Sequence, residues 1–470
     1  MSKNCKLKDG LNAITITSIF EASALNRDEK IGGNIPSIKK LTRGNKGDKG
    51  IFSYISRVAM RHYLFETLSK NPLTKDNWIY ANCFESGTGD KKVVQLDLRT
   101  QNIITHAELD AFGYMFTIGG QQSLARKAAV GITKAVALET WEGDMQFNAN
   151  HDFASRCLAN PNPVNKEEHR SFYKVSFTID IDKLGYDVWW IKDHNYDDTT
   201  KRLTLFLSDK GTDVVLKDVK KEREGQFKID EHEITIDGLS CTVSKKLMEE
   251  KTEKPKNQEE KKYISFKKGK SKSFKIYEDE YSGDDEEDFY QFNIGKYSYD
   301  EKQKILTLSS FVLAHSIEAD EKEKDKKYSI KVKDNTVGEI TIETNGSKKK
   351  AIFRLQNEAK IERLLQILEI LKNGLIYHVS GENDGIVPQF MIAAGLSLPI
   401  PIFNSFVELG GFESSILNNG YILNHNDSKK LVYVYNPKNL VGNIDTKNLY
   451  TDWDSFLEQC GVKVKNETGS

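Results

Sequence analysis

Lys174–Ile181 (KVSFTIDI) decides the fold class, because its side chains alternate in polarity without a break. Such a period of two predicts a strand, and its apolar face would carry Val175, Phe177, Ile179 and Ile181. Ala13–Phe20 (AITITSIF) predicts a second strand in the same way. Because a few helices lie between strands without repeating strand–helix–strand units, the sequence predicts an α+β fold.

Other elements can be placed around these two strands. Apolar residues at helical spacing predict helices over Ile51–Leu68 and over a segment from Asn357, the expected N-cap, to the C-cap Gly374. A shorter helix is predicted over Ala107–Phe116. Further strands are predicted over Val93–Leu98, Ala128–Glu139 and Lys201–Ser208. Ile386–Phe403 is apolar but contains three prolines, which indicates buried core and loop rather than a membrane span.

The composition changes after Gly185. Lys245–Ile330 contains 19 Lys and 20 Asp or Glu, and no Arg. Runs within it such as Glu278–Glu280 and Asp284–Asp288 are expected to bury too little apolar surface to fold alone. We therefore expect residues 1–184 and 351–470 to form the main body, and residues 185–350 to form a large charged insertion, part β-structure and part loop.

The chain as a whole is nearly neutral, with 68 Lys and Arg against 69 Asp and Glu. This balance excludes a uniformly basic coat, so any anion binding requires local segregation of charge. Five scattered cysteines predict reduced thiols in a cytoplasmic protein. The first ten residues lack the apolar stretch of a signal peptide, and no membrane partner is expected.

Motifs of known catalytic sites are missing from the sequence. HExxH, GxSxG and GxxxxGK[ST] do not occur, and Gly44–Gly50 (GNKGDKG) has the wrong spacing for a phosphate-binding loop. Asp180 and Asp182, on the outward face of their strand, have no third ligand nearby. The sequence therefore predicts no catalytic residue, no metal and no cofactor.

One stretch is strongly basic. From Lys30 to Arg61 the chain has one acid, Asp48, and eight basic residues: Lys30, Lys39, Lys40, Arg43, Lys46, Lys49, Arg57 and Arg61. Its glycines expose backbone N–H groups, and a helix that starts near Ile51 would add its positive end. Arg57 and Arg61 are four residues apart and would share a helix face. Such a surface suits phosphates, with an ordinary solvated face as the alternative.

Several segments in a fixed order carry a resemblance to a known family: Ser18–Lys30 (SIFEASALNRDEK), Ile51–Leu64 (IFSYISRVAMRHYL), Ala107–Phe116 with Ala125–Leu138 (ARKAAVGITKAVAL), and Ile386–Phe403. In their order and spacing the chain resembles the DevR family of CRISPR-associated proteins, the backbone subunits of type I effector complexes (Cascade), with I-B the expected subtype. The resemblance spans about residues 10–182 and 351–405. The insertion is longer than the family pattern.

The resemblance implies a modified RRM-like (ferredoxin-like) palm, helical fingers and a protruding hairpin thumb at about residues 141–170. It also implies that several copies polymerise on a CRISPR guide RNA, hold its spacer for pairing with target DNA, and contact other Cascade subunits. A single RNA strand needs a basic track and apolar groups that separate or stack its bases. The residues expected to supply them are Arg27, Lys39, Lys40, Arg43, Lys46, Arg57, Arg61, Arg126, Lys127, Met145 and Phe147.

Three alternatives stay open. Met145 and Phe147 would be ordinary core if the segment around them packs down. Asp28 lies in the loop after the first strand, where subunits of type III complexes carry an aspartate for metal-dependent RNA cleavage, but it has no second carboxylate pattern beside it. A transcriptional regulator, which the DevR name suggests, would need a helix-turn-helix pattern that the sequence lacks. The favoured interpretation is a non-catalytic guide-RNA-binding subunit.

Overall fold

The structure of the chain is a computed structural model. It describes residues 5–23, 27, 37–44, 49–86, 93–119, 122–207, 213–237, 240–253, 261–267, 274–277, 281–283, 288–310, 313–346, 348–377, 385–426 and 429–464. Strands dominate and helices are few, as expected for the predicted α+β class.

A central antiparallel sheet, here called the main sheet, runs in the order β9-β12-β1-β32-β35, and β8 also pairs with β12. Its strands are β1 (Ala13–Ala22), β8 (Val130–Ile132), β9 (Ala135–Ala137), β12 (Ser171–Asp180), β32 (Phe390–Leu396) and β35 (Val432–Tyr435). The strands predicted from alternation, β1 and β12, lie side by side in the centre, with Ile16 opposite Phe177. The strand predicted over residues 128–139 is split into β8 and β9.

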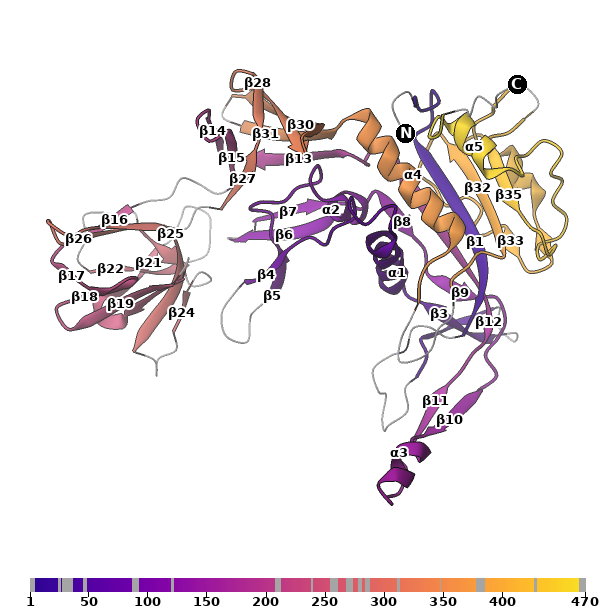
Figure 1. Cartoon of the computed structure of the whole chain (residues 1–470), viewed down its shortest axis with the longest axis horizontal. Coiled ribbons are helices and arrows are strands. Elements are labelled where there is room, and N and C mark those ends of the chain that lie inside the picture. Colours follow the sequence, from indigo (N-terminus) through magenta and orange to yellow (C-terminus); the bar gives the residue numbers. More distant parts are fainter. Residues whose placement is uncertain are drawn as a thin grey trace.

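Two helices, α1 (Arg57–Lys70) and α4 (Asn357–Asn373), pack on one face of the main sheet (Figure 1). The apolar face predicted for β12 lies in this core, together with Ile14 and Ile16 of β1. The helix predicted from Ile51 begins later, at Arg57, because Ser56 caps it through the Ala59 N–H. Gly50–Ile55 instead forms strand β3, which pairs with β2 (Lys40–Arg43) and with β9. The N-cap of α4 is Gln356, one residue before the predicted Asn357.

The opposite face of the main sheet carries hydroxyl pairs in its centre, such as Thr17 with Ser176 at 2.7 Å. The C-terminal part of the chain covers much of this face and forms a second core around Phe390, Ile392 and Val434. It includes β33 (Val407–Glu408), β34 (Gly411–Phe412) and α5 (Trp453–Cys460), which packs beside β35. Ile386–Phe403, predicted as core and loop, supplies the buried strand β32 followed by the proline segment.

Residues 141–170, here called the arm, form a hairpin that projects from one end of the main sheet (Figure 1). Its strands are β10 (Met145–Ala149) and β11 (Pro163–Glu167), with the short helix α3 (His151–Arg156) at the tip. The chain between β9 and β12 is far longer than the usual connection of ~4–6 residues, and it leaves the core rather than crossing it.

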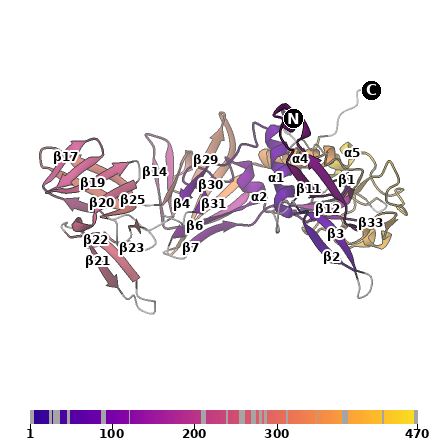
Figure 2. The ribbon, with the colours of Figure 1, turned by 90° about the horizontal axis from the view of Figure 1, so that it is seen from below.

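Between the main sheet and the far end lies a middle unit with its own core (Figure 2). It contains two hairpins, β4 (Cys83–Ser86) with β5 (Val93–Leu96) and β6 (Tyr114–Gly119) with β7 (Gln122–Arg126). Beside them lies a sheet of β13 (Tyr186–Ile191), β31 (Lys348–Leu355), β30 (Asn335–Asn345), β29 (Lys327–Val332) and β28 (Asp320–Glu323). A third sheet joins β14 (Asp193–Asp197), β15 (Arg202–Phe206) and β27 (Ala314–Glu318).

Only the first part of the helix predicted over residues 107–116 is helical. It ends as α2 (Ala107–Phe112), and the chain then turns through Gly113 into β6. Gly113 has φ +67°, and a Cβ there would lie 2.3 Å from the Arg126 carbonyl oxygen, so only glycine fits this turn.

The far end of the molecule is an outer unit, residues 213–310, which buries its own apolar core. Its larger sheet consists of β16 (Asp213–Leu216), β17 (Val219–Arg223), β18 (Gln226–Ile229), β19 (His232–Asp237), β20 (Ser240–Ser244), β24 (Tyr281–Ser282), β25 (Phe289–Asp300) and β26 (Ile305–Ser310). A smaller one consists of β21 (Met248–Glu253), β22 (Lys261–Phe266) and β23 (Ile276–Tyr277).

The insertion was expected to be part β-structure and part charged loop, and its described residues are largely strands. The acidic runs expected not to fold alone lie, except for Asp288, outside the described residues. Strands β20 to β26 bury residues such as Phe292 and Leu308 on one side, while lysines and acids occupy the alternate, outward positions. The charged residues of such a strand are those on its outward face, so a high charge content does not prevent its other face from being buried. The unit leaves and rejoins the middle unit at one point, where the Leu207 N–H donates to the Leu313 carbonyl over 2.9 Å.

Candidate nucleic-acid interface

Helix α1 presents basic side chains on its solvent-facing side. Arg57 and Arg61 are both exposed, and they lie one turn apart as the sequence predicted. Arg61 is partly engaged, because its guanidinium lies 3.4 Å from Glu108 and 5.1 Å from the centre of the Phe112 ring. Arg57 is the cation closest to the positively polarised first turn of the helix.

The β2–β3 hairpin carries the next group of predicted residues. Arg43 is exposed and lies 5.8 Å from the centre of the Phe52 ring on the partner strand. Lys39 is half-buried, and its carbonyl accepts the Tyr54 N–H over 2.9 Å. Lys46 lies outside the described residues. The basic stretch is thus mounted on a strand pair beside the arm, rather than on a glycine loop that leads directly into a helix.

A polar cluster fixes the base of the arm. Lys40 Nζ donates to Glu167 over 2.7 Å and lies 4.0 Å above the Trp141 ring. Arg27 binds the Glu168 carboxylate over 2.8 Å and also the Glu167 carbonyl. Because both predicted phosphate ligands are engaged with acids of the arm, they position it in this structure. Sequence spacing gave no sign of this, since the partners are more than 120 residues apart.

The arm exposes apolar side chains along its length. Met145 and Phe147 are 51% and 63% exposed, so the alternative that they pack as ordinary core does not hold. Two further residues, Phe153 and Leu158, are 65% and 97% exposed at the tip. Sequence reasoning did not single out these two for the interface, although their apolar character in a non-periodic segment was the available signal. Exposed apolar groups on a slender hairpin are typical of a surface that binds something.

Arg126 is not available to a nucleic acid in this structure, which corrects that prediction. It is buried, and its guanidinium binds the Asp110 carboxylate over 2.7 Å and the Lys183 carbonyl over 2.6 Å. Arg363 of α4 donates to the same carboxylate over 2.8 Å. This buried cluster joins α2, β7 and α4, and breaking it by removal of one partner would leave an uncompensated charge. The neighbouring Lys127 is exposed, as an RNA-contacting residue must be.

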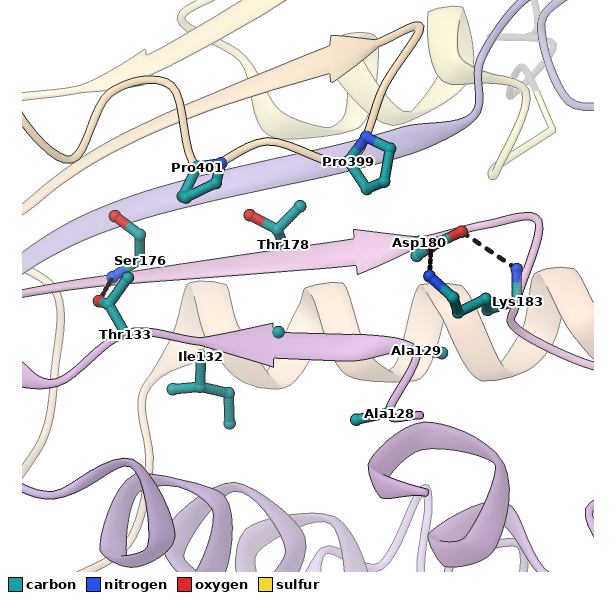
Figure 3. A pocket seen from close by; sticks show the side chains of 11 residues that line it. Ala128, Ala129, Ile132, Thr133, Ser176, Thr178, Asp180, Lys183, Pro399 and Pro401 are labelled. Atoms are coloured by element: carbon teal, nitrogen blue, oxygen red, sulfur yellow. Dashed lines mark hydrogen bonds and ion pairs between the residues drawn. The ribbon is translucent and has the colours of Figure 1, made fainter. Parts of the chain in front are cut away.

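Beside Lys127, the uncovered part of the main sheet forms a hollow of about 300 Å³. Figure 3 shows the hydroxyls of Ser176 and Thr178 on its floor, with Pro399 and Pro401 opposite. Asp180, expected to face water, is buried at its end and binds Lys183. These side chains satisfy one another, so the hollow offers hydroxyl and apolar surface but no free charge of its own.

Two further buried basic groups are structural. Lys174 Nζ donates to the Val407 carbonyl over 2.7 Å, and burial lowers the pKa of its ammonium. His169, where the arm returns to β12, lies 2.7 Å from the Ser53 hydroxyl, and burial lowers its pKa so that the imidazole is neutral. Ser53 and His169 are both buried, so this pair offers no accessible nucleophile.

Within the described ranges no three His, Cys, Asp or Glu side chains gather as a metal site would require. Asp28, the residue on which the cleavage alternative depends, lies outside those ranges. The same part of the chain contains no helix long and apolar enough to cross a membrane.

Comparisons with known proteins identify the family. The family described as CRISPR-associated negative auto-regulator DevR/Csa2 matches residues 14–415. A curated relative, the CRISPR-associated protein Cas7/Cst2/DevR of Myxococcus xanthus (strain DK1622), is 26% identical over 177 residues. The match covers 34% of this chain and 55% of the relative, so the chain spans about half the length of that protein.

Among solved structures, a chain of a Type IV-B CRISPR complex matches with 12% identity and a TM-score of 0.22, over 35% of this chain and 71% of its own length. That score is too low to bear on the fold. The family match, by contrast, spans most of the sequence and includes the arm, the insertion and the main sheet except β35. The chain therefore belongs to the DevR/Csa2 family of CRISPR-associated proteins.

Proposed function

We propose that this chain is a non-catalytic backbone subunit of a CRISPR effector complex, which binds the guide RNA and packs beside further copies of itself along it. In this proposal the spacer of the guide stays accessible for pairing with target DNA. The assembly is a type I Cascade complex of subtype I-B in the cytoplasm, and its other subunits cap the row of copies. Membership of the DevR/Csa2 family supports the CRISPR context.

The topology of the main sheet supports an RRM-like palm. Along the chain, β1, α1, β8 with β9, β12, α4 and β32 follow one another, and the sheet order is β32-β1-β12-β8/β9. That is the β-α-β-β-α-β arrangement of ferredoxin-like folds, which RRM domains use to present a sheet to single-stranded RNA. Much of the face opposite the helices is covered here. RNA contacts are therefore assigned to the sheet end where β2, β3 and the arm meet, to the exposed side of α1, and to Lys127 near the opposite end of β12.

The observation that carries the proposal is the arm itself. It places exposed Met145 and Phe147 on β10. Arg43 lies on the β2–β3 hairpin, whose Ile51 carbonyl accepts the Trp141 N–H at the base of the arm over 2.7 Å, and Arg57 begins α1 after β3. Cations hold phosphates, and an apolar wedge that enters a stack of bases is stabilised by the bases that cover it. We assign the arm as the thumb, which reaches onto the guide held by the neighbouring copy. Arg27 and Lys40 position it, and Lys39, Arg43, Arg57, Arg61 and Lys127 contact phosphates.

The absence of a nuclease motif in the sequence is the reason to propose a non-catalytic role. Residue Asp28 provides the discriminating variant, because metal-dependent cleavage by a type III-like subunit would depend on it. Labelled guide and complementary RNA are incubated with the protein and Mg²⁺ or Mn²⁺. No cleavage is expected, and cleavage that Asp28→Ala abolishes would replace the proposal by its enzymatic alternative.

Guide binding is tested on protein purified from cells that express a CRISPR array. Nucleic acid extracted from it should be RNA of one uniform length, and the complex should contain several copies of the chain. Arg57→Ala with Arg61→Ala should reduce the RNA recovered. The exposed pair Arg202→Ala with Arg223→Ala, in the middle and outer units, is the matched control and should recover as much RNA as the unmodified protein. RNA of random length, or none, would overturn the proposal.

A further inference from the structure

The middle unit carries an exposed aromatic surface that guide binding does not explain. Strand β13 lies at one edge of its sheet, and its Trp190 is 64% exposed, with Tyr186 on the same face at 39%. The alternate residue Trp189 is buried in the core of the unit. A solvent-facing tryptophan with most of its surface uncovered indicates a binding site more often than a structural residue.

Cations flank these rings on the neighbouring strand. In the register of β13 with β31, Tyr186 lies opposite Arg354 and Trp190 lies opposite Lys350. The Arg354 guanidinium lies 5.5 Å from the centre of the Tyr186 ring. Lys348 is exposed two residues before Lys350, on the same face of β31. The outward positions of these two strands therefore hold two aromatic rings and three cations, and no acid.

Acids appear only one strand farther from the edge. On β30, Glu343 pairs with Lys350 over 2.8 Å, and Glu339 pairs with Lys327 of β29 over 2.8 Å. Lys350 is thus compensated by Glu343, whereas neither Lys348 nor Arg354 has an ion pair among the described residues, so the excess positive charge lies beside the exposed rings. This segregation matters in a chain whose formal net charge is only −1.

The strand edge itself is partly closed to a partner strand. The Val188 N–H is bonded to the Asp187 carboxylate over 2.9 Å, and Arg126 donates to the Tyr186 carbonyl over 3.3 Å. A protein segment that extends the sheet would need these groups. Recognition is therefore assigned to the face, through its rings and cations, and not to the edge.

We propose that this face, formed by Tyr186, Trp190, Lys348, Lys350 and Arg354, binds a segment of single-stranded nucleic acid that is not paired with the guide. Aromatic rings on a sheet stack on bases of any sequence, and flanking cations follow the phosphates. The site lies on the middle unit, away from the arm (Figure 1). Its Tyr186 end adjoins Lys127 of the proposed guide-binding surface, because the neighbouring Arg126 donates to the Tyr186 carbonyl, whereas Trp190 lies four residues farther along β13.

The test uses guide-loaded complex and a fluorescent oligonucleotide of about twenty deoxythymidines, which cannot pair with the guide. The complex is expected to bind this strand with a salt-dependent affinity. Trp190→Ala should weaken binding roughly tenfold, the effect typical of losing one stacked base. Arg354→Ala should weaken it too and lower the slope of log K against log salt by about 0.7, as one lost phosphate contact on a single strand does.

The control is Tyr421→Ala, which removes an exposed aromatic ring (42%, close to the 39% of Tyr186) from the C-terminal part and should leave binding unchanged. Trp190→Phe keeps a stacking ring and should restore most of the affinity. Ultraviolet crosslinking should join the strand to the peptide that contains Trp190.

Binding unaffected by Trp190→Ala and Arg354→Ala would overturn the inference, as would crosslinks confined to the arm. If the complex instead binds a protein that Trp190→Ala releases, and binds no oligonucleotide, the face is a protein interface and the inference is wrong. The length of the RNA that copurifies with each variant is measured in parallel. A variant that keeps guide RNA of uniform length but no longer binds the thymidine strand shows that this site is distinct from the guide surface. A variant that loses the guide itself would count against the proposed function instead.

Discussion

The arm and the outer unit are both excursions from the main sheet, but they treat their apolar side chains in opposite ways. The arm leaves Met145, Phe147, Phe153 and Leu158 exposed. The outer unit, in a far more charged stretch of sequence, buries Phe227, Phe292 and Leu308 almost completely. The difference teaches that composition does not decide burial. Alternation in paired strands does, because it gathers apolar residues on one face of a sheet whatever stands on the other.

The contrast has a functional side. An apolar group in the outer unit stabilises the unit, whereas the same group on the arm adds little to stability and is free to meet a ligand. We therefore expect substitutions in the two regions to separate stability from binding, and the predictions below follow the size of the expected effect.

The largest effect is expected from Phe227→Ala in the core of the outer unit. Phe227 is 1% exposed and lies between the rings of Tyr297 and Tyr299. Its removal should cost the unit about 3–5 kcal/mol, visible as earlier urea unfolding and faster hydrogen exchange of residues 213–310. Phe147→Ala on the arm is the control and should change stability by less than about 0.5 kcal/mol. Equal losses for the two variants would mean that the arm packs against the chain in solution.

A smaller effect on stability is expected from acid, through the middle unit. His315 of β27 is fully buried, and burial lowers its pKa to about 4 from the ordinary 6.5. Its Nδ1 lies 2.8 Å from the Leu98 carbonyl, and its Nε2 accepts from the Asn102 amide at 3.1 Å. Asn102 cannot reverse its amide, because its oxygen accepts the Ile104 N–H over 2.8 Å. The imidazole is therefore held neutral, with its proton on Nδ1.

Because the unfolded chain binds this proton at higher pH than the folded one, stability should fall as the pH drops from about 6.5 towards 4. Each pKa unit corresponds to ~1.4 kcal/mol, so the lowering of the His315 pKa from 6.5 to about 4 makes the full loss of stability about 3 kcal/mol. His315→Gln, whose amide can also donate and accept, should flatten that part of the pH profile in urea unfolding. An unchanged profile would place the titration elsewhere, for example at His106 or His169, whose pKa values burial also lowers.

The next effect concerns binding and should leave stability untouched. Arg57→Ala with Arg61→Ala should weaken RNA affinity regardless of sequence. It should lower the slope of log K against log salt by about 0.7 for each lost contact. The measurement is a salt series of RNA binding, with Arg202→Ala and Arg223→Ala as the control pair. A slope equal to that of the unmodified protein would show that the two arginines merely face solvent.

The smallest effect on guide binding is expected from the largest change, removal of the outer unit. Residues 208–312 can be replaced by a short Gly/Ser linker, because Leu207 and Leu313 are already joined by a hydrogen bond. The shortened protein should still recover guide RNA of uniform length. Removal of Lys245–Ile330, a cut suggested by charge alone, would also take Ile317, Tyr328 and Ile330 out of the core of the middle unit and should fail to fold. RNA lost from a folded 208–312 deletion would make the outer unit part of the assembly.

How far the sequence predicts this molecule depends on how local each signal is. Alternation correctly placed β1 and β12, and helical spacing placed α4, because those signals lie within one element. The start of α1 was misplaced, since the strand β3 before it has apolar residues that also fit a helix. For the outer unit, charge content and composition predicted only a mixture of β-structure and charged loop, because the individual strands were not sought by their period.

The candidate site was predicted unevenly for the same reason. Exposure of Arg57, Lys127 and Phe147 follows from their own segments. Arg126 binds Asp110 and Lys40 donates to Glu167, and in both pairs the partner is distant in sequence. Such pairs leave no signal in the local sequence.

The claim that the arm inserts apolar side chains into the bound RNA can be measured most directly by nuclease footprinting of the guide within the assembled complex. The measurement compares the unmodified protein with a variant that carries Met145→Ala and Phe147→Ala, using Tyr421→Ala as a control. We predict regularly spaced cleavage protection in the unmodified and control complexes, and weakened periodicity in the arm variant, which stays folded. Identical footprints for all three complexes, from protein that is folded and guide-loaded, would contradict the assignment of the arm as the RNA-inserting thumb.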